Sequence, residues 1–300
     1  MALSRFATWF VLLALTLTPG CGDPLGWDIP DARTSAPPEA FSELASHAWY
    51  ATWGASQAAF NRKVTQYAAE GYRLADLEIY RYDGQTQFAG IWLKDHRAWK
   101  AWWQHDRHAF DQQFKVMSAK GYQPVDLEIT SFDGDARYSA IWIENPVGPR
   151  WVMRWGLDYE QFKDELDARA AEGYQPVDLE MVEVNGHARY AYIMVFAPDV
   201  DWVIRWGLSR DRMGEELDAH VLEGYRIIDL DVFFPGGEVR GGAILVRDDW
   251  PVDWDFTMSR SSGELDEVFE GMGGYYRPAS IFVAPHEDGG MLYVWTWLAN

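Results

Sequence analysis

The sequence has almost no cysteine: Cys21 is the only one among 300 residues. A lone cysteine cannot close an internal disulfide, so the fold must be stable by packing alone. Four common catalytic or nucleotide-binding patterns are also missing, namely Gly-x-Ser-x-Gly, Ser-x-x-Lys, His-Glu-x-x-His and Gly-x-x-x-x-Gly-Lys. The sequence therefore predicts no catalytic residue, no metal and no cofactor.

Basic residues are scarce relative to acidic ones. The chain has 26 Lys and Arg against 46 Asp and Glu, a formal net charge of −20. Such a surface repels phosphate backbones and anionic lipid headgroups. The balance argues against a nucleic-acid partner and against electrostatic binding to a membrane, although negative charge is also simply a means to solubility.

A hydrophobic run long enough to span a bilayer is absent at the N-terminus. Residues 6–17 are apolar and follow Arg5, but these 12 residues are well short of the roughly 20 that a spanning helix needs. The pattern is typical of a cleavable export signal, which we assign to residues 1–20.

Cys21 directly follows a small residue at the expected cleavage point. This segment resembles a bacterial lipobox, in which the cysteine is lipidated and becomes the first residue of the mature protein. The resemblance implies a lipid anchor on Cys21 and a place in the bacterial cell envelope, at the outer membrane, facing the periplasm or on the cell surface. The alternative is an ordinary secretory signal with a coincidental cysteine. Residues 21–47 are rich in Pro, Gly, Ala and Ser and predict a flexible tether.

Repetition dominates the rest of the chain. A Gly-Tyr pair recurs at steps of 50, 52, 51 and 50 residues, beginning at Gly71, Gly121, Gly173, Gly224 and Gly274. A fixed period of this size indicates a modular fold in which each unit buries its apolar face against its neighbours. The predicted units are residues 48–97, 98–149, 150–200, 201–248 and 249–300.

Each unit has the same internal order. Two tryptophans spaced four apart begin it, as in Trp151 and Trp155, on a short predicted strand. An N-capping residue such as Asp158 then starts an amphipathic helix, which stops at the repeated glycine. An Asp-Leu-Glu strand follows, then an Asp-Gly or Asn-Gly turn and a returning strand. The fifth tryptophan pair is assigned to Trp250 and Trp254. The sequence thus predicts a β-α-β-β unit five times over.

The assembly of the units has two alternatives. An open solenoid needs polar terminal repeats, whereas a closed ring needs none. We expect a toroid or α/β-propeller of five blades. The divergent fifth unit, where Ser280-Ile281-Phe282 replaces the Asp-Leu-Glu triplet, keeps the open arrangement in consideration.

The repeated tryptophans favour core packing over sugar binding. Ten rings burying roughly 150–250 Å² each represent on the order of 40–60 kcal/mol of gross hydrophobic stabilisation, too much surface to leave in water. Trp27, Trp102 and Trp297 lie outside the five-fold pattern and are the better candidates for ligand contact.

Paired carboxylates are the sharper candidate for a site. Strand alternation places both acids of each triplet on one face, so that the units together would form an acidic ring able to bind a cation or cationic ligand. The alternative is that each carboxylate caps or pairs locally, for instance with Arg137, Arg189 and Arg240 on the returning strands. The acids concerned are Asp76, Glu78, Asp126, Glu128, Asp178, Glu180, Asp229 and Asp231.

The motifs Gly-Tyr-Gln-Pro-Val-Asp-Leu-Glu (121–128 and 173–180) and Asp-Gly-Asp-Ala-Arg-Tyr-Ser-Ala-Ile-Trp (133–142) resemble the bacterial tandem repeat domain. Similar repeats precede the serine hydrolase domain of secreted polyglycine hydrolases. The resemblance covers about residues 48–300 and implies recognition rather than cleavage, because no hydrolase domain is present to carry it. The five-fold plan also resembles the pentein propellers, but their catalytic cysteine has no counterpart here.

Three functions therefore remain. The first is a non-catalytic, lipid-anchored envelope module that binds a peptide, a glycan or a partner protein, or serves as a scaffold. The second is an enzyme of unrecognised type that uses the acidic residues, and the third is a purely structural envelope protein.

Overall fold

The computed structural model describes residues 42–46, 49–95, 97–145, 148–247, 253–259, 262–272, 275–285 and 290–299. The predicted signal, Cys21 and most of the predicted tether lie outside these residues. Within them, no helix combines the length and the apolar character that crossing a membrane requires.

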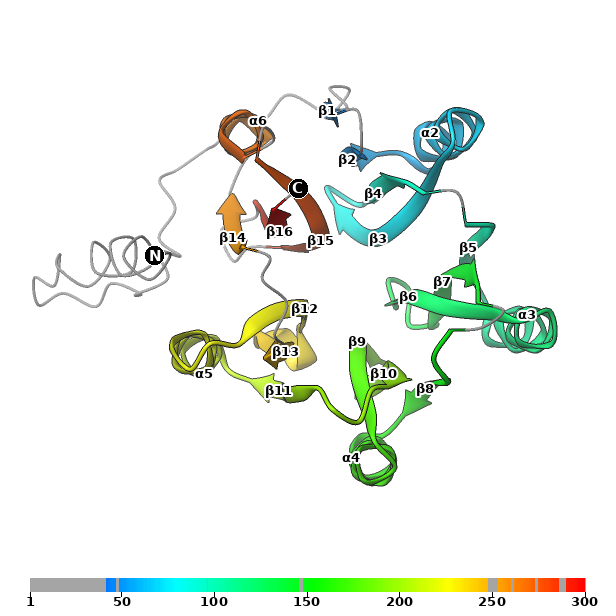
Figure 1. The fold of residues 1–300 in the computed structure, drawn as a ribbon, viewed down its shortest axis with the longest axis vertical. Coiled ribbons are helices and arrows are strands. Elements are labelled where there is room, and N and C mark those ends of the chain that lie inside the picture. Colours follow the sequence, from blue (N-terminus) through cyan, green and yellow to red (C-terminus); the bar gives the residue numbers. More distant parts are fainter. Residues whose placement is uncertain are drawn as a thin grey trace, which may run out of the picture.

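The described chain contains five units, each a three-stranded antiparallel sheet with one helix (Figure 1). The order β-α-β-β predicted from the sequence is confirmed. Unit one holds β2 (Trp49–Ala55), α2 (Gln57–Ala69), β3 (Tyr72–Tyr82) and β4 (Gln85–Lys94). Unit two holds β5 (Trp99–His105), α3 (Arg107–Ala119), β6 (Tyr122–Thr130) and β7 (Arg137–Glu144). Unit three holds β8 (Trp151–Leu157), α4 (Tyr159–Ala171), β9 (Tyr174–Val184) and β10 (His187–Phe196).

Unit four holds β11 (Asp201–Leu208), α5 (Arg210–Leu222), β12 (Arg226–Phe233), the 3₁₀ turn η1 (Pro235–Gly237) and β13 (Arg240–Arg247). Unit five holds β14 (Trp254–Ser259), α6 (Ser262–Met272), β15 (Tyr276–Pro285) and β16 (Met291–Ala299). In every sheet the last strand of the unit lies between the other two, as in β8-β10-β9. The five sheets are separate from one another.

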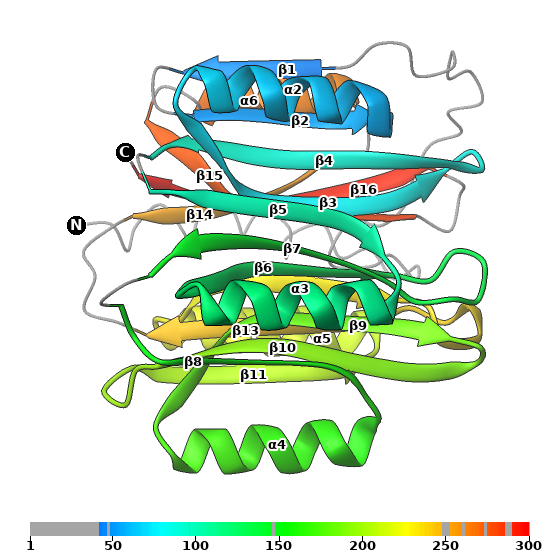
Figure 2. The ribbon, with the colours of Figure 1, turned by 90° about the vertical axis from the view of Figure 1, so that its right-hand side faces the viewer.

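The units are arranged around a common centre (Figure 1). The strands that follow the helices, β3, β6, β9, β12 and β15, face this centre, and the helices lie at the periphery. Figure 2 shows the helices lengthwise, so they and the strands run through the thickness of the molecule. Neighbouring inner strands contact each other in the order β3, β6, β9, β12 and β15, and β15 also contacts β3.

Local signals explain where the helices begin and end. The Asp158 side chain accepts the Gln161 N–H at 2.9 Å, while the Gln161 side chain accepts the Asp158 N–H at 3.1 Å, which is the predicted capping box of α4. Ser209 occupies the equivalent position before α5 but makes no side-chain capping bond. Gly173 follows α4 with a φ of 86°, the left-handed conformation that a glycine adopts without strain.

Two of the predicted tight hairpin turns are confirmed. Asp83-Gly84 and Asn185-Gly186 have positive φ at both positions, as a type I′ turn requires. Unit two differs, because its strands end at Thr130 and resume at Arg137, leaving a longer connection around Gly134. In unit four the connection is η1.

The described tryptophans of the pairs pack between units, as predicted, and Trp250 lies outside the described residues. Trp53 is buried in a cluster with Phe269 and Trp295 of unit five, and its ring lies 5.2 Å from that of Phe269. Trp103 contacts Phe60 of unit one, and Trp206 contacts Phe162 of unit three. Each unit thus places its tryptophans on the core of the unit before it.

Three expectations differ from the structure. Trp254 pairs with Leu298 as Trp49 pairs with Leu93, so Trp254 stands at the first tryptophan position of unit five and not the second. Trp297 has no exposed surface, so it cannot contact a ligand. The end of the predicted tether, Ser42–Ser46, forms strand β1, which pairs antiparallel with β2.

Candidate functional site

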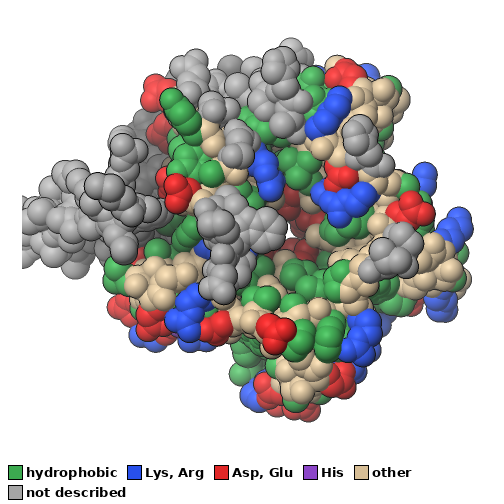
Figure 3. Space-filling model, viewed as in Figure 1, with side chains coloured by type: hydrophobic (Ala, Val, Ile, Leu, Met, Phe, Trp, Pro, Cys, Tyr) green, Lys and Arg blue, Asp and Glu red, His purple; other side chains and the backbone are tan. Residues whose placement is uncertain are grey.

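Carboxyl groups gather at the centre of the molecule. The eight predicted acids lie on four inner strands, two on each of β3, β6, β9 and β12. Figure 3 shows the centre hollowed, with acidic side chains inside it. Asp126, Glu128, Asp178 and Asp231 are buried, and the other four are partly buried. The predicted alternation therefore brings all eight together.

These carboxylates bind the backbone of the preceding unit. Asp178 accepts the Leu127 N–H at 3.0 Å, and Glu180 accepts the Ile129 N–H at 2.9 Å. Asp229 accepts the Leu179 N–H at 2.8 Å in the same way. The remaining bonds of this carboxyl ladder join Ile79 N–H to Glu128, Met181 N–H to Asp231, Ile281 N–H to Asp76 and Val283 N–H to Glu78. Backbone groups that a separate sheet leaves unpaired are thus satisfied by the next unit.

The alternative of pairing with arginine is wrong. Arg240 contacts Glu238 at 2.7 Å, and Arg137 lies 3.9 Å from Asp135. Arg189 donates to the backbone oxygen of Ala188 at 2.9 Å. None of these three arginines forms an ion pair with the ladder within the described residues. The nearest ionisable groups of these carboxyls are therefore other carboxyls of the ladder.

This environment favours the protonated carboxyls. Burial raises the pKa of Asp76 to about 6 and that of Asp229 to about 7, although the bonds from Ile281 and Leu179 act in the opposite direction. Burial, followed by repulsion from Asp76, raises the pKa of Asp126 well above its usual range. Burial likewise raises the pKa of the other five acids. The environment of these acids thus favours their neutral form, whereas the sequence suggested a ring of charged carboxylates.

A pocket of about 600 Å³ lies between units three and four. We call this part of each junction the rim: it is formed by the first helix residue of one unit, such as Tyr159, and by first-strand residues of the next unit, such as Gly207. Tyr159 and Tyr190 line it from unit three, and Trp206, Phe233 and Arg240 line it from unit four. Tyr159 is 48% exposed, so the pocket opens to solvent. Four aromatic side chains with a few polar groups are typical of a ligand pocket.

The equivalent place between units two and three is occupied. Arg107 begins α3 as Tyr159 begins α4, and its Nη1 atom would lie only 2.9 Å from a Cβ added at Gly156. Gly207 is the counterpart of Gly156 in unit four, and nothing lies within 4 Å of a Cβ added there. Unit three has Tyr159 at the position where unit two has Arg107. The space over Gly207 therefore stays open, whereas Arg107 fills the equivalent space over Gly156.

The junction of units one and two is closed in another way. Gln104 takes the place of the glycine, with a φ of 61°, and its Nε2 donates to Thr130 Oγ1 at 2.9 Å. Thr130 itself stands where unit four has the larger Phe233. At this junction, two side chains of unit two are therefore hydrogen-bonded to each other where unit four has Gly207 and Phe233.

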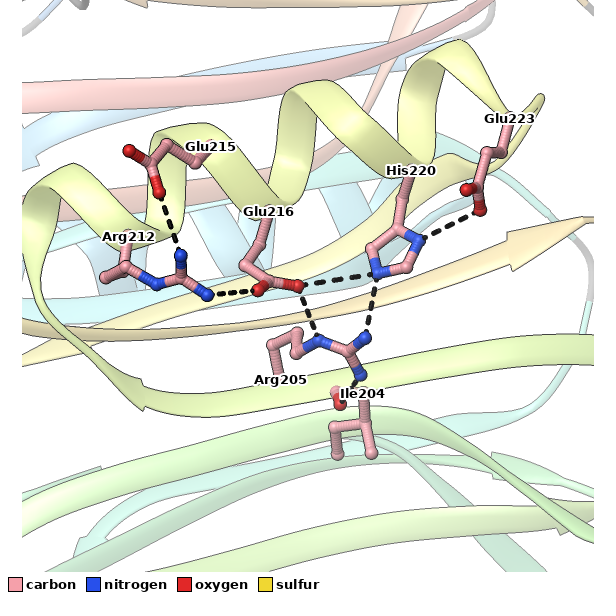
Figure 4. A network of polar contacts seen from close by, with 7 residues as sticks. All are labelled: Ile204, Arg205, Arg212, Glu215, Glu216, His220 and Glu223. Atoms are coloured by element: carbon pink, nitrogen blue, oxygen red, sulfur yellow. Dashed lines mark hydrogen bonds and ion pairs between the residues drawn. The ribbon is translucent and has the colours of Figure 1, made fainter.

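Arg205, which also lines the pocket, contacts side chains of α5 (Figure 4). Its Nε donates to Glu216 at 2.9 Å, and its Nη2 lies 3.0 Å from His220 Nε2. Arg212 contacts the other oxygen of Glu216 at 2.7 Å, and Glu223 lies 3.5 Å from His220 Nδ1. The charge of Arg205 is therefore compensated inside unit four.

In the part of the chain that the structure describes, no group of three His, Cys, Asp or Glu side chains is arranged to hold a metal ion. His105 and His108, which the sequence places near one another, belong to no such group, and His96 lies outside the described residues.

Comparison with known families decides the relationship of the chain. Residues 46–95, 96–145, 148–197 and 199–244 each match the family described as polyglycine hydrolase-like, structural repeat. The chain belongs to this family. The four matches cover more than half of the sequence and coincide with units one to four of the structure. No curated protein matches the chain.

The match to the structural repeat family covers units one to four, the same four units whose inner strands carry the eight acids. It does not account for the pocket, which depends on Tyr159 and Gly207. Sequence reasoning missed this pocket. The signal that could have found it is the change from Arg107 to Tyr159 at one position of the repeat.

Proposed function

We propose that this protein is a non-catalytic binding module of the bacterial envelope, anchored through a lipid on Cys21, with its five units closed into a toroid. The anchor rests on the lipobox-like segment at residues 18–21. Closure is supported by the bonds from Ile281 N–H and Val283 N–H of unit five to Asp76 and Glu78 of unit one, at 2.7 and 3.2 Å. The core shared by Trp53 and Trp295 supports it further.

The observation that carries the binding function is the pocket between units three and four. It is lined by four aromatic rings, and the described side chains around it include no nucleophile paired with a base. A site that offers shape and ring surface without acid, base or nucleophile fits recognition better than chemistry. The enzyme alternative loses support, because the carboxyls it would use accept backbone hydrogen bonds instead.

A purely structural role is the second candidate, and the carboxyl ladder favours it. Seven of the eight acids accept a backbone N–H of the unit before, and Asp126 instead shares a side-chain hydrogen bond with Asp76 of unit one. A protein built only to be a stable ring would need this ladder but would have no use for an open aromatic pocket. The two candidates therefore differ in whether the pocket is used.

Binding is tested with the full chain as bait against envelope extract and against glycan and peptide arrays. The matched control is Tyr159→Arg, which puts at this junction the residue that fills the previous one. A ligand captured by the wild-type chain and lost with Tyr159→Arg supports the binding function. If both proteins capture the same set, or neither captures anything, the structural role replaces it.

The anchor is tested separately by cell fractionation of the Cys21→Ser variant. We expect the wild-type chain in the membrane fraction and the variant in the soluble fraction, because a lipid attached at Cys21 supplies the membrane affinity that a −20 surface does not. Retention of the variant in the membrane fraction would show that the anchor proposal is wrong.

A further inference from the structure

The chain itself shows what can occupy the space at a junction. Between units two and three, the occupant is the guanidinium of Arg107, which lies over Gly156 next to the Tyr138 hydroxyl. Arg107 comes from the start of α3, while Gly156 belongs to β8 of the following unit. A cationic, planar group on an alkyl chain therefore bridges this junction.

The junction of units three and four keeps the tyrosine and the glycine that surround this cation and lacks the cation itself, and Lys163 stands where the previous junction has Asp111. Tyr190 replaces Tyr138 at the equivalent strand position, since it pairs with Met181 as Tyr138 pairs with Ile129. Gly207 replaces Gly156 with a similar φ, 65° against 69°. The space over Gly207 is open, so a group supplied from outside can enter where Arg107 lies next door.

The lining suits a cation. Its lining includes the aromatic side chains of Tyr159, Tyr190, Trp206 and Phe233, and the faces of such rings attract guanidinium and ammonium groups. One face of Tyr190 is stacked on Phe162. The Tyr159 and Tyr190 hydroxyls make no hydrogen bond within the described residues, and each can accept one from a guanidinium. The net charge of −20 also draws cationic ligands towards the protein.

The two arginines of the pocket do not prevent this. Arg205 is compensated by Glu216, and Arg240 by Glu238 at 2.7 Å. At the neighbouring junction, Arg189 is the counterpart of Arg240, and both Arg189 and Arg107 act electrostatically on the Tyr138 hydroxyl. Two guanidinium groups are thus accommodated at the equivalent place, where the Asp111 carboxylate also acts on the Tyr138 hydroxyl.

We propose that the pocket between units three and four binds a guanidinium group carried on an alkyl chain, as Arg107 does for the junction before it. The inference rests on the proposed binding function and names its ligand chemistry. The ligand can be a small alkylguanidine or an arginine side chain of a peptide, since both present the same group.

The test is calorimetric titration of the full chain with agmatine and, in a second arm, with a blocked Ala-Arg-Ala peptide. We expect saturable binding at one site per chain in at least one arm, and the arm that saturates identifies the source. Butylamide-capped alanine peptide of the same length without arginine is the matched control and should not bind. Circular dichroism of every variant confirms that it is folded.

Two variants exchange the junctions. Tyr159→Arg supplies the cation internally and should weaken agmatine binding at least tenfold. Arg107→Tyr empties the junction of units two and three and should raise the stoichiometry towards two. Trp206→Phe, which keeps a ring but shrinks its face, should weaken binding by a smaller factor.

The inference is overturned if folded wild-type chain shows no saturable binding in either arm, or if Tyr159→Arg binds as tightly as wild type. Failure of the inference is distinguishable from failure of the proposed function. If a neutral glycan or an arginine-free peptide binds the wild-type chain and not Tyr159→Arg, the binding function stands and the guanidinium inference is wrong. If the folded wild-type chain binds no ligand of any kind, both the binding function and the guanidinium inference are wrong.

Discussion

At the centre of the molecule, Asp178 and Asp229 hold equivalent positions and make equivalent bonds, to the N–H groups of Leu127 and Leu179 at 3.0 and 2.8 Å. At the rim the same pair of junctions differs. Arg107 covers Gly156 at one of them, while Tyr159 leaves the space over Gly207 open at the next. One repeat pattern thus supplies a constant centre and a variable rim.

The carboxyl ladder at the centre holds the units together, whereas the side chains at the rim distinguish one junction from the next. A bond made at nearly every junction is a requirement of stacking, because each inner strand exposes N–H groups that its own sheet does not pair. A residue that changes from one junction to the next is free of this requirement. Properties of the centre should therefore affect stability, and properties of the rim should affect ligand binding.

The largest effect expected at the centre is a dependence of stability on pH. The pKa values of Asp76 and Asp229, about 6 and about 7 in the folded state, lie above the value near 4 of an unfolded chain. The folded state therefore binds more protons, and the stabilisation is fully present below the unfolded pKa and lost as pH rises through 6 to 7. We expect the free energy of unfolding to increase by on the order of 3 kcal/mol from pH 8 to pH 5, measured by urea denaturation.

The double variant Asp76→Asn/Asp229→Asn is the control for this pH dependence. Its two amides do not titrate, so the increase on acidification should shrink by about half or more. An unchanged slope would assign the effect to the general charge of −20 and not to the ladder. Agmatine binding at the rim should change neither with the shift from pH 8 to pH 5 nor with the double variant.

A single bond of the ladder comes next in size. Asp178→Ala leaves the buried N–H of Leu127 without its acceptor, and we expect a loss of about 1–3 kcal/mol in the free energy of unfolding. Asp178→Asn keeps an oxygen at the same place and imitates the protonated acid, so it should cost much less at pH 7. Equal losses for the two variants would contradict the hydrogen bond as the reason for Asp178.

Much of the fold could be predicted because its signals are local. The capping box of Asp158, the stop at Gly173 and the Asn185-Gly186 turn each act over a few residues, and all three are as expected. Alternation also placed the acids on one face. The longer turn around Gly134 differs, because Asp-Gly permits a type I′ turn but does not prevent strands from ending earlier.

Contacts between units could not be predicted in the same way. The acceptor role of Asp178 depends on the register of β9 against β6, which belong to different sheets and share no turn that fixes it. Arg189 was a candidate partner because the three arginines stand at equivalent places on the returning strands, yet it donates to Ala188. The pocket likewise depends on which side chain of one unit covers a glycine of the next.

The smallest effect concerns the helix start that carries Tyr159. Asp158→Ala removes the capping box of α4 and should cost about 1 kcal/mol of unfolding free energy, whereas Ser209→Ala before α5 removes no capping bond and should cost only a few tenths. Urea denaturation of both variants measures the difference. Because Tyr159 is the first residue of α4, Asp158→Ala should also weaken agmatine binding, and Ser209→Ala should leave it unchanged. Parallel loss of binding in both variants would mean that the rim responds to general stability, and the separation between centre and rim would then fail at this helix.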